Sequence, residues 1–457
     1  MRDYHRLYNA ENNASPVKTA PAAAGRGLSR SSPFLKPKSA RTRLGDWTWS
    51  FSMNQHSLAA RETSPIIDPQ TLIENPHTNL AALRVHYPVI RLGERHYMAL
   101  RAKDVVPMFT DPRTRQIEGK DYVRLNQIPK GVTSRLVSDF FLFSNEDVHR
   151  TKRGLFARTF AFGAMREATT RIRATADRIV AELPRGESFD FVERMGARIP
   201  SAMIAAILGL PQADAEYFVP RVNVLARSVA PVYPHARHRE IETAAAELFS
   251  YVEGHLRSRL EMPGDDLLST LITDWNENPA ISFESLVHQV LGVIVGGSDT
   301  TRAGFAMMVA LLLRHRDQWE ALRDDPVLIP GAVNEALRYD PPVGSIARFT
   351  KEDVEIGGAH LPAGVMLRLS TMSAMRDRDL YARPDEFDIR RTDHPRLHTV
   401  FGFGPHRCLG EMLARLEMQE GLAALLAAAP DIRLETSPRL LGFGGIREIT
   451  RMQVRIR

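Results

Sequence analysis

The single cysteine of this chain, Cys408, lies in the glycine-rich stretch FGFGPHRCLG at residues 401–410. A lone cysteine most often packs as a small buried hydrophobe, and it cannot form an internal disulfide. Residues 409–429 have the pattern of a long helix, which places Cys408 at the helix start. Unpaired N–H groups and the helix dipole favour a thiolate there. Such a thiolate suits either a nucleophile or a metal ligand.

The residues around Cys408 help to separate these two chemistries. His406 is poorly placed to act as the base of a nucleophile, because it lies only two residues away in a turn. A zinc site would need further cysteines, and the sequence has none. Gly402, Gly404 and Gly410 allow unusual backbone angles and the close approach of a flat ligand. The pattern therefore indicates axial ligation of a haem iron by Cys408.

A second unusual stretch lies inside a predicted helix over residues 282–314. The run contains no proline, and Ser282 is a predicted N-cap. It is apolar on nearly every face and should be buried. The polar residues 296–301 and Arg302 interrupt it near its middle, which argues against a membrane span. Buried polar groups and glycines weaken a helix, so this centre is a candidate site.

The cysteine stretch resembles the haem-binding loop of the cytochrome P450 family, F-x-x-G-x-[R/H]-x-C-x-G. The matching residues are Phe401, Gly404, His406, Cys408 and Gly410. The resemblance covers roughly residues 65–457 and implies the cytochrome P450 fold, with haem b as the cofactor and the Cys408 thiolate as the iron ligand.

The helix centre GGSDTT, residues 296–301, resembles the family's [A/G]-G-x-[D/E]-T-[T/S]. The resemblance implies that Gly296 and Gly297 open a groove above the iron, and that Asp299 and Thr300 relay protons to iron-bound oxygen. Taken alone, Thr300 could be a hydroxyl bonded back to its own helix, and Asp299 a surface acid.

A third motif, Glu335 and Arg338, resembles the family's E-x-x-R. Alone, such a pair is worth a few tenths of a kcal/mol on an exposed helix face. The resemblance implies that Arg391 completes a buried Glu-Arg-Arg cluster that supports folding rather than chemistry.

Four basic residues resemble ligands of the haem propionates. They are His149, Arg153, Arg348 and His398. Each residue alone is more typical of a solvated surface base, and the four together favour a haem-binding site. Arg150, Lys152 and Arg407 could form a basic docking face for an acidic redox partner, or could simply be solvated.

The positive charge of the chain belongs to its beginning. Residues 1–52 hold nine basic and three acidic residues, and the remaining chain is balanced. This distribution argues against a nucleic-acid-binding domain. We interpret residues 1–60 as a disordered leader or as sequence upstream of a true start at Met53, with a transit peptide as the alternative. Residues 61–457 are predicted to form one haem-thiolate domain, in the cytoplasm.

Helical periodicity dominates the rest of the chain, so we predict a mainly α fold with a minor, mainly antiparallel β part. A hairpin is expected at 88–100 and a second β-rich patch at 353–370. Further helices are expected at 166–183, 191–208 and 240–260.

The resemblance implies a monooxygenase that inserts one atom of O2 into an apolar small molecule, within a cavity lined by Val293, Gly297, Val343 and Ile346. A separate ferredoxin and ferredoxin reductase should supply the electrons, since the chain has no nucleotide-binding loop or cysteine cluster. Neither a nucleic-acid partner nor a membrane span is expected. Two alternatives remain: a peroxide-using or electron-independent haem-thiolate enzyme, and a haem-based sensor or carrier.

Overall fold

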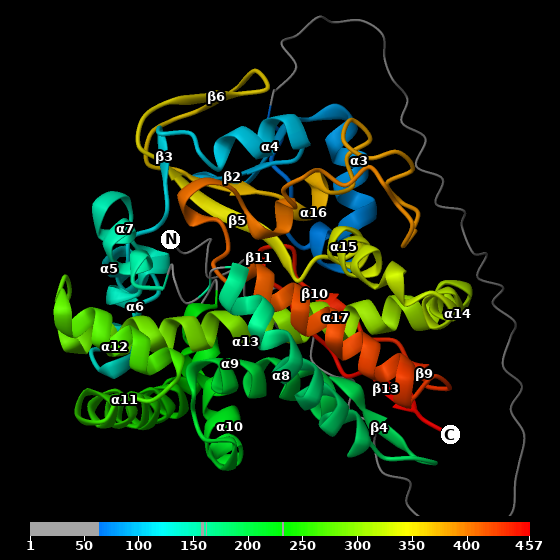
Figure 1. The fold of residues 1–457 in the computed structure, drawn as a ribbon. Coiled ribbons are helices and arrows are strands. Elements are labelled where there is room, and N and C mark those ends of the chain that lie inside the picture. Colours follow the sequence, from blue (N-terminus) through cyan, green and yellow to red (C-terminus); the bar gives the residue numbers. More distant parts are fainter. Residues whose placement is uncertain (1–63, 157–159, 161, 231–232) are drawn as a thin grey trace, which may run out of the picture.

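The computed structural model describes residues 64–156, 160, 162–230 and 233–457. Helices make up most of this part of the chain. The largest sheet lies on one side of it, and a small sheet near the C-terminus lies on another (Figure 1). The predicted mainly α fold is therefore confirmed. The interpretation of residues 1–60 lies outside the described residues.

The long helix predicted at 282–314 is confirmed as α13, Phe283–Arg314, and it crosses the middle of the molecule (Figure 1). Ser282 caps it by accepting a hydrogen bond from the Ser285 N–H at 3.1 Å. Most of its side chains are buried, because other helices cover it on several sides. These neighbours are α9 (Arg198–Leu208), α11 (His238–Glu261), α15 (Ile329–Tyr339) and α17 (Glu411–Ala428).

Shorter helices surround this centre. They are α3 (Pro76–His86), α4 (Ala102–Met108), α5 (Gly119–Leu125), α6 (Val132–Asp139), α7 (Glu146–Gly154), α8 (Phe162–Ala181), α10 (Ala215–Leu225), α12 (Leu267–Glu277) and α14 (Arg316–Asp324). The helices predicted at 166–183 and 240–260 are confirmed as α8 and α11. Within the described residues, no helix combines the length and apolarity needed to cross a membrane.

The helix predicted at 191–208 is divided in two. A π-helical turn at Val192–Gly196 precedes α9. Gly196 lies directly against α13, where an added Cβ would be 3.6 Å from the Ala306 Cβ and the Arg302 carbonyl oxygen. The wide turn thus lets the backbone approach the central helix, a feature that apolar spacing alone does not reveal.

The main sheet follows the order β1 (Val89–Gly93), β2 (His96–Ala99), β8 (Met366–Leu369), β5 (Val343–Thr350) and β11 (Gly445–Ile446), with β3 (Thr114–Arg115) also paired to β5. The predicted hairpin at 88–100 is confirmed as β1 and β2. The patch at 353–370 forms β6 (Val354–Ile356), β7 (Ala359–Leu361) and β8. Pairing is antiparallel except between β2 and β8, which run parallel.

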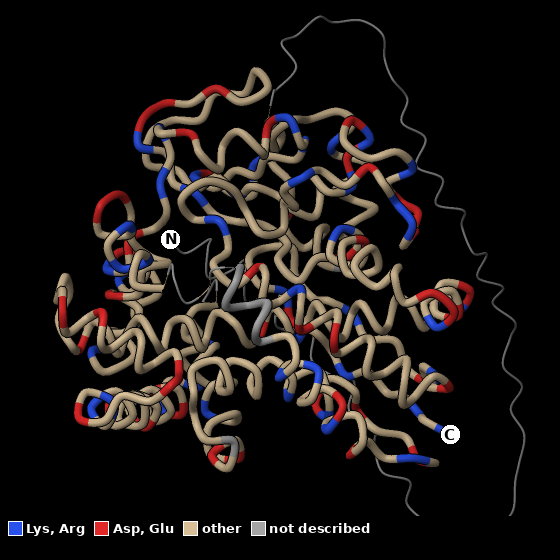
Figure 2. Tube along the Cα trace, viewed as in Figure 1, with Lys and Arg blue, Asp and Glu red and all other residues tan. Residues whose placement is uncertain are grey.

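The end of the chain ties the helical side together. β13 (Gln453–Arg455) lies between β4 (Ser188–Asp190) and β9 (Arg433–Thr436). Acidic and basic residues are interspersed around the described part of the molecule (Figure 2), in agreement with the balanced charge of the chain beyond residue 52.

Candidate functional site

The Cys408 loop is held in shape by its own backbone. The Cys408 N–H donates to the Phe401 carbonyl at 2.8 Å, and Arg407 Nη1 donates to the Gly402 carbonyl at 2.6 Å. Gly402 and Gly404 have φ of +69° and +68°, a region that side chains rarely adopt. The loop can therefore turn sharply before α17 and present Cys408 at the helix start.

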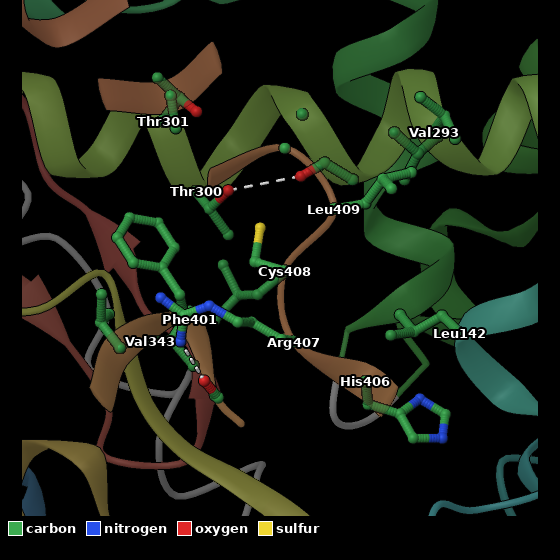
Figure 3. Close-up of a pocket in the computed structure, with 18 of the residues that line it drawn as sticks. Leu142, Val293, Thr300, Thr301, Val343, Phe401, His406, Arg407, Cys408 and Leu409 are labelled. Carbon is green, nitrogen blue, oxygen red and sulfur yellow. Dashed lines mark hydrogen bonds between the residues drawn. The ribbon is translucent and has the colours of Figure 1, made fainter. Parts of the chain in front are cut away.

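A cavity of about 330 Å³ lies between this loop and α13. Cys408 is exposed to the cavity, and the Thr300 side chain points toward it from α13 (Figure 3). The four residues expected to line an apolar pocket, Val293, Gly297, Val343 and Ile346, all line this cavity.

Glycines leave the space between α13 and the loop open. At Gly296, Gly297 and Gly410 an added Cβ would meet no heavy atom within 4 Å. All three residues line the cavity. Any larger residue at these positions would extend into the space above or beside Cys408, so the opening suits a flat group.

Two arginines give the cavity positive charge. Arg153 Nη2 donates to the Arg407 carbonyl at 2.6 Å, and Arg348 Nε donates to Thr114 Oγ1 at 3.2 Å. Burial lowers the pKa of Arg348 to about 10. In the described part of the chain, neither guanidinium forms an ion pair with a carboxylate. Both can therefore bind an anionic group.

Two histidines lie beside these arginines. The rings of His149 and His406 lie 3.9 Å apart between centroids, and burial lowers their pKa to about 4 and about 3, respectively. His149 Nε2 is buried, with no hydrogen-bond partner among the described residues. His406 lines the cavity (Figure 3), and His149, which does not line it, packs against the His406 ring.

Sequence reasoning did not count His406 among the cofactor residues. Its signal was available, because it is the [R/H] position of the haem-loop pattern, two residues before Cys408. His398, which was counted, does not line the cavity. Its Nε2 lies 3.1 Å from the Asn334 carbonyl of α15, and its ring accepts from the Val400 N–H. His398 thus secures the start of the loop against α15.

Asp299 and Thr300 both line the cavity at the weak centre of α13. Thr300 Oγ1 donates to the Gly296 carbonyl at 3.4 Å, a long bond that leaves the hydroxyl free to rotate. Asp299 Oδ1 lies 2.9 Å from Arg302 Nη2. A hydroxyl next to a carboxylate can accept and pass on protons, so this pair can move a proton beside Cys408.

The helix start does not dominate the ionisation of Cys408. Desolvation raises the pKa of its thiol, although the Gly410 N–H, Arg153 and Arg407 act in the opposite direction. The Gly410 N–H at the helix start thus acts in the expected direction, and desolvation acts against it. A bound metal cation reverses this balance, because a coordinating thiol loses its proton.

The residues of the Glu-Arg-Arg cluster are in contact; Glu335 and Arg338 are fully buried, and the side chain of Arg391 is 4% exposed. Arg338 donates to both Glu335 carboxylate oxygens, at 2.7 and 2.8 Å, and Arg391 Nε lies 3.2 Å from Oε2. Arg338 also donates to the carbonyls of Met375 and Pro384 at 3.1 and 2.7 Å. The cluster thus joins α15 to the segment that precedes the Cys408 loop, and it lies outside the cavity.

The three basic residues of the expected docking face differ in exposure. Lys152 is turned inward, with its Nζ 2.5 Å from Asp139 Oδ1. Arg407 pairs with Glu411 at 2.5 Å and is one-fifth exposed. Arg150 is 80% exposed and forms a surface ion pair with Asp147 at 2.6 Å, so of the three it alone is largely exposed.

Comparison with known proteins agrees with this site. Residues 327–428 match the family model described as Cytochrome P450. One curated relative is the plant-inducible cytochrome P450-pinF1 of Rhizobium radiobacter, which is 36% identical over 83% of this chain and 90% of that protein. Another is nocardicin C N-oxygenase of Nocardia uniformis subsp. tsuyamanensis, which is 32% identical over 82% of this chain and 92% of that protein.

Solved structures show the same fold. The crystal structure of CalO2 has a TM-score of 0.79 and 28% identity, covering 86% of this chain and 99% of that one. The structure of the tirandamycin C-bound P450 monooxygenase TamI has a TM-score of 0.73 and 26% identity, covering 86% of this chain and 100% of that one. The chain belongs to the cytochrome P450 family of haem monooxygenases.

Proposed function

We propose that haem b binds in the cavity with Cys408 as the iron ligand. The open space at Gly296, Gly297 and Gly410 supports this assignment because it suits a flat macrocycle. Arg153, Arg348 and His406 would hold the two propionates, with His149 behind His406. When bound, the haem supplies the centre at which O2 is activated, and the thiolate ligand favours O–O cleavage.

The proposed reaction inserts one oxygen atom into an apolar substrate. The substrate, one O2, two electrons and two protons give the oxygenated product and one water. A separate iron–sulfur protein of the ferredoxin type and its reductase would deliver the electrons. Apolar residues such as Val293 and Ile346 would bind the substrate by excluding water from it. The location of Cys408 and the Asp299–Thr300 pair in one apolar cavity carries the proposal.

Within this reaction Thr300 and Asp299 would transfer protons. The Thr300 hydroxyl would turn from the Gly296 carbonyl toward the cavity and donate there. After leaving Arg302, Asp299 would take up a proton from solvent and pass it to the Thr300 hydroxyl. The redox partner would dock on the side of α7, where Arg150 offers an exposed charge to an acidic surface.

The test is reconstitution with a ferredoxin and reductase, comparing wild type with Thr300→Ala. Product formed per electron should fall by about tenfold in the variant, with peroxide released instead, because one general acid is lost. Turnover with peroxide alone that is unaffected by Thr300→Ala would favour a peroxide-using enzyme. Binding of CO without consumption of reductant with any substrate would favour a sensor or carrier.

A further inference from the structure

Gln289 is a fully buried polar residue of α13 that has no part in the reaction proposed so far. It is 0% exposed, in a stretch of the helix whose other residues are mainly apolar. Burying an amide is unfavourable unless its hydrogen bonds are made. The Gln289 amide makes them with the backbone at the end of α6, so these partners indicate its role.

The amide binds the backbone on both sides of Phe140. Gln289 Oε1 accepts from the Phe141 N–H at 2.8 Å, and Nε2 donates to the Asp139 carbonyl at 3.0 Å. Nε2 also donates to the Ser285 carbonyl, one turn earlier on α13, at 3.1 Å. The polar atoms of the side chain are thus all used, and the amide holds this backbone as a neighbouring strand would.

The segment held in this way forms an aromatic wall of the cavity. Phe140 and Phe141 both line the cavity, and their rings lie 4.8 Å apart between centroids. Gln289, Gly292 and Val293 follow at three- and four-residue spacing and so share one face of α13. Gly292 leaves room for Phe140, since an added Cβ there would lie 2.1 Å from Phe140 Cδ2. The ring therefore packs against α13 in the place that the Gln289 hydrogen bonds give its backbone.

Asp139 is held through its side chain as well. Its Oδ2 lies 3.0 Å from His288 Nδ1, and its Oδ1 lies 2.5 Å from Lys152 Nζ of α7. Contacts from two helices thus meet at the residue before Phe140. The aromatic wall is therefore fixed between α13 and α7.

We propose that Gln289 is a positioning residue that sets substrate selectivity by fixing Phe140 and Phe141. The inference rests on the proposed function, since the cavity must hold the substrate of that reaction. A wall whose backbone cannot shift selects apolar substrates by shape, because a group that overlaps the Phe140 ring is excluded by steric clash. An apolar side chain of similar length at position 289 would keep the helix and release the wall.

Two variants that lose the same kind of hydrogen bonds test this role. Gln289→Met removes both bonds to the wall and keeps the length of the side chain. Gln318→Met is the control, because Gln318 of α14 holds backbone in the same way outside the cavity. Its Nε2 donates to the Phe387 carbonyl at 2.7 Å, and its Oε1 accepts from the Ile389 N–H at 3.0 Å.

Amide hydrogen exchange of the haem-loaded protein should report the loss at each place. In Gln289→Met, the Phe141 N–H should exchange about tenfold faster or more than in wild type, because its acceptor is gone. In Gln318→Met, the Ile389 N–H should do so and the Phe141 N–H should not.

Selectivity is measured with azoles, whose imidazole nitrogen binds haem iron and shifts the haem absorption band. The probes are N-phenylimidazole, with one ring beyond the azole, and N-biphenylylimidazole, with two. In Gln289→Met, the Kd of the larger probe relative to that of the smaller should fall about fivefold, because a released wall gives way to the larger group. In Gln318→Met this ratio should stay within about twofold of wild type.

A double-mutant cycle shows whether Gln289 acts through the aromatic wall. In a Phe140→Ala background, Gln289→Met should change the Kd ratio by less than about twofold, because the ring that it positions is already gone. A change as large as that in the wild-type background would contradict the proposal.

The outcomes separate this proposal from the proposed function. If the Kd ratio is unchanged in Gln289→Met, or shifts equally in Gln318→Met, Gln289 has only a structural role and the monooxygenase assignment stands. If even unsubstituted imidazole leaves the spectrum of haem-loaded wild-type protein unchanged, no open iron site faces the cavity and the proposed function itself fails. Should Gln289→Met not fold, exchange in the wild-type protein decides: a protected Phe141 N–H supports the proposal, and one that exchanges as fast as an exposed amide overturns it.

Discussion

Arg348 reaches the cavity from β5 and pairs with no carboxylate among the described residues, and burial lowers its pKa to about 10. A hydrogen bond to a charged partner is worth about 1.5–3 kcal/mol, so Arg348→Met should weaken haem binding to the apoprotein about tenfold or more. The stability of the apoprotein should not fall, because the variant removes a desolvated charge.

Titration of the apoprotein with haem measures this effect. Arg150→Met serves as the control, since Arg150 is 80% exposed on α7. Equal haem affinities for the two variants would contradict the assignment of Arg348 to a propionate.

His398 should make the free energy of unfolding depend on pH. It is 2% exposed, and burial lowers its pKa from 6.5 to about 3. Below pH 6.5 the unfolded chain binds a proton here and the folded protein does not, so stability is full above this pH and is lost as the pH falls toward 3. Through His398, the free energy of unfolding should fall by about 2 kcal/mol between about pH 7 and pH 5.

Urea titrations of the apoprotein across this pH range check the prediction. In His398→Asn the decline should be shallower by that amount. Identical slopes in the two proteins would show that His398 is protonated equally in both states.

At the residue scale, the sequence allowed prediction of those site residues that belong to short local motifs. Cys408, Asp299 and Thr300 were identified because neighbouring glycines and spacing accompany them, and all three line the cavity. The orientation of isolated bases could not be predicted, since it depends on partners far along the chain. Lys152 turns inward to Asp139, and His398 turns to Asn334 rather than to the cavity.

At the scale of elements, two glycines of α13 should respond in opposite ways to the same change. At Gly292 an added Cβ would lie 2.1 Å from Phe140 Cδ2, so Gly292→Ala must displace that ring. We expect a loss of about 1–3 kcal/mol in the free energy of unfolding. At Gly296 the space is open, and Gly296→Ala should stabilise the apoprotein by up to about 1 kcal/mol through helix propensity.

Urea denaturation of the two apoprotein variants measures this difference. Gly296→Ala should nevertheless weaken haem or ligand binding, because its Cβ extends into the cavity. Equal changes in stability at both positions would contradict the packing of Phe140 on α13.

The elements themselves were predictable where a local pattern defines them. α13 was anticipated from its apolar run and its cap at Ser282, and the β1–β2 hairpin from its turn. The parallel pairing of β2 with β8 was not anticipated, because it joins residues far apart in the sequence. The π-helical turn before α9 was missed for a related reason, since contact with α13 at Gly196 accompanies it.

At the scale of the whole molecule, the cluster around Glu335 joins segments that are distant in the chain. Glu335→Gln would leave Arg338 and Arg391 without their shared carboxylate in a fully buried place. Breaking a buried ion pair in this way costs about 3–5 kcal/mol. The exposed pair Glu253–Arg257 provides the control, where Glu253→Gln should cost less than about 1 kcal/mol.

Thermal or urea unfolding of both apoproteins, together with haem content after expression, tests this difference. A loss of only a few tenths of a kcal/mol in Glu335→Gln would show that the cluster does not hold the haem-binding part of the fold.

The central claim is that Cys408 ligates haem iron, and the CO-difference spectrum of the reduced protein tests it most directly. The haem-loaded wild-type protein should show the red-shifted band of thiolate-ligated haem, and Cys408→Ala and Cys408→His should lose it while remaining folded. Folded, haem-loaded wild-type protein that lacks this band, or a Cys408→Ala variant that keeps it, would contradict the account.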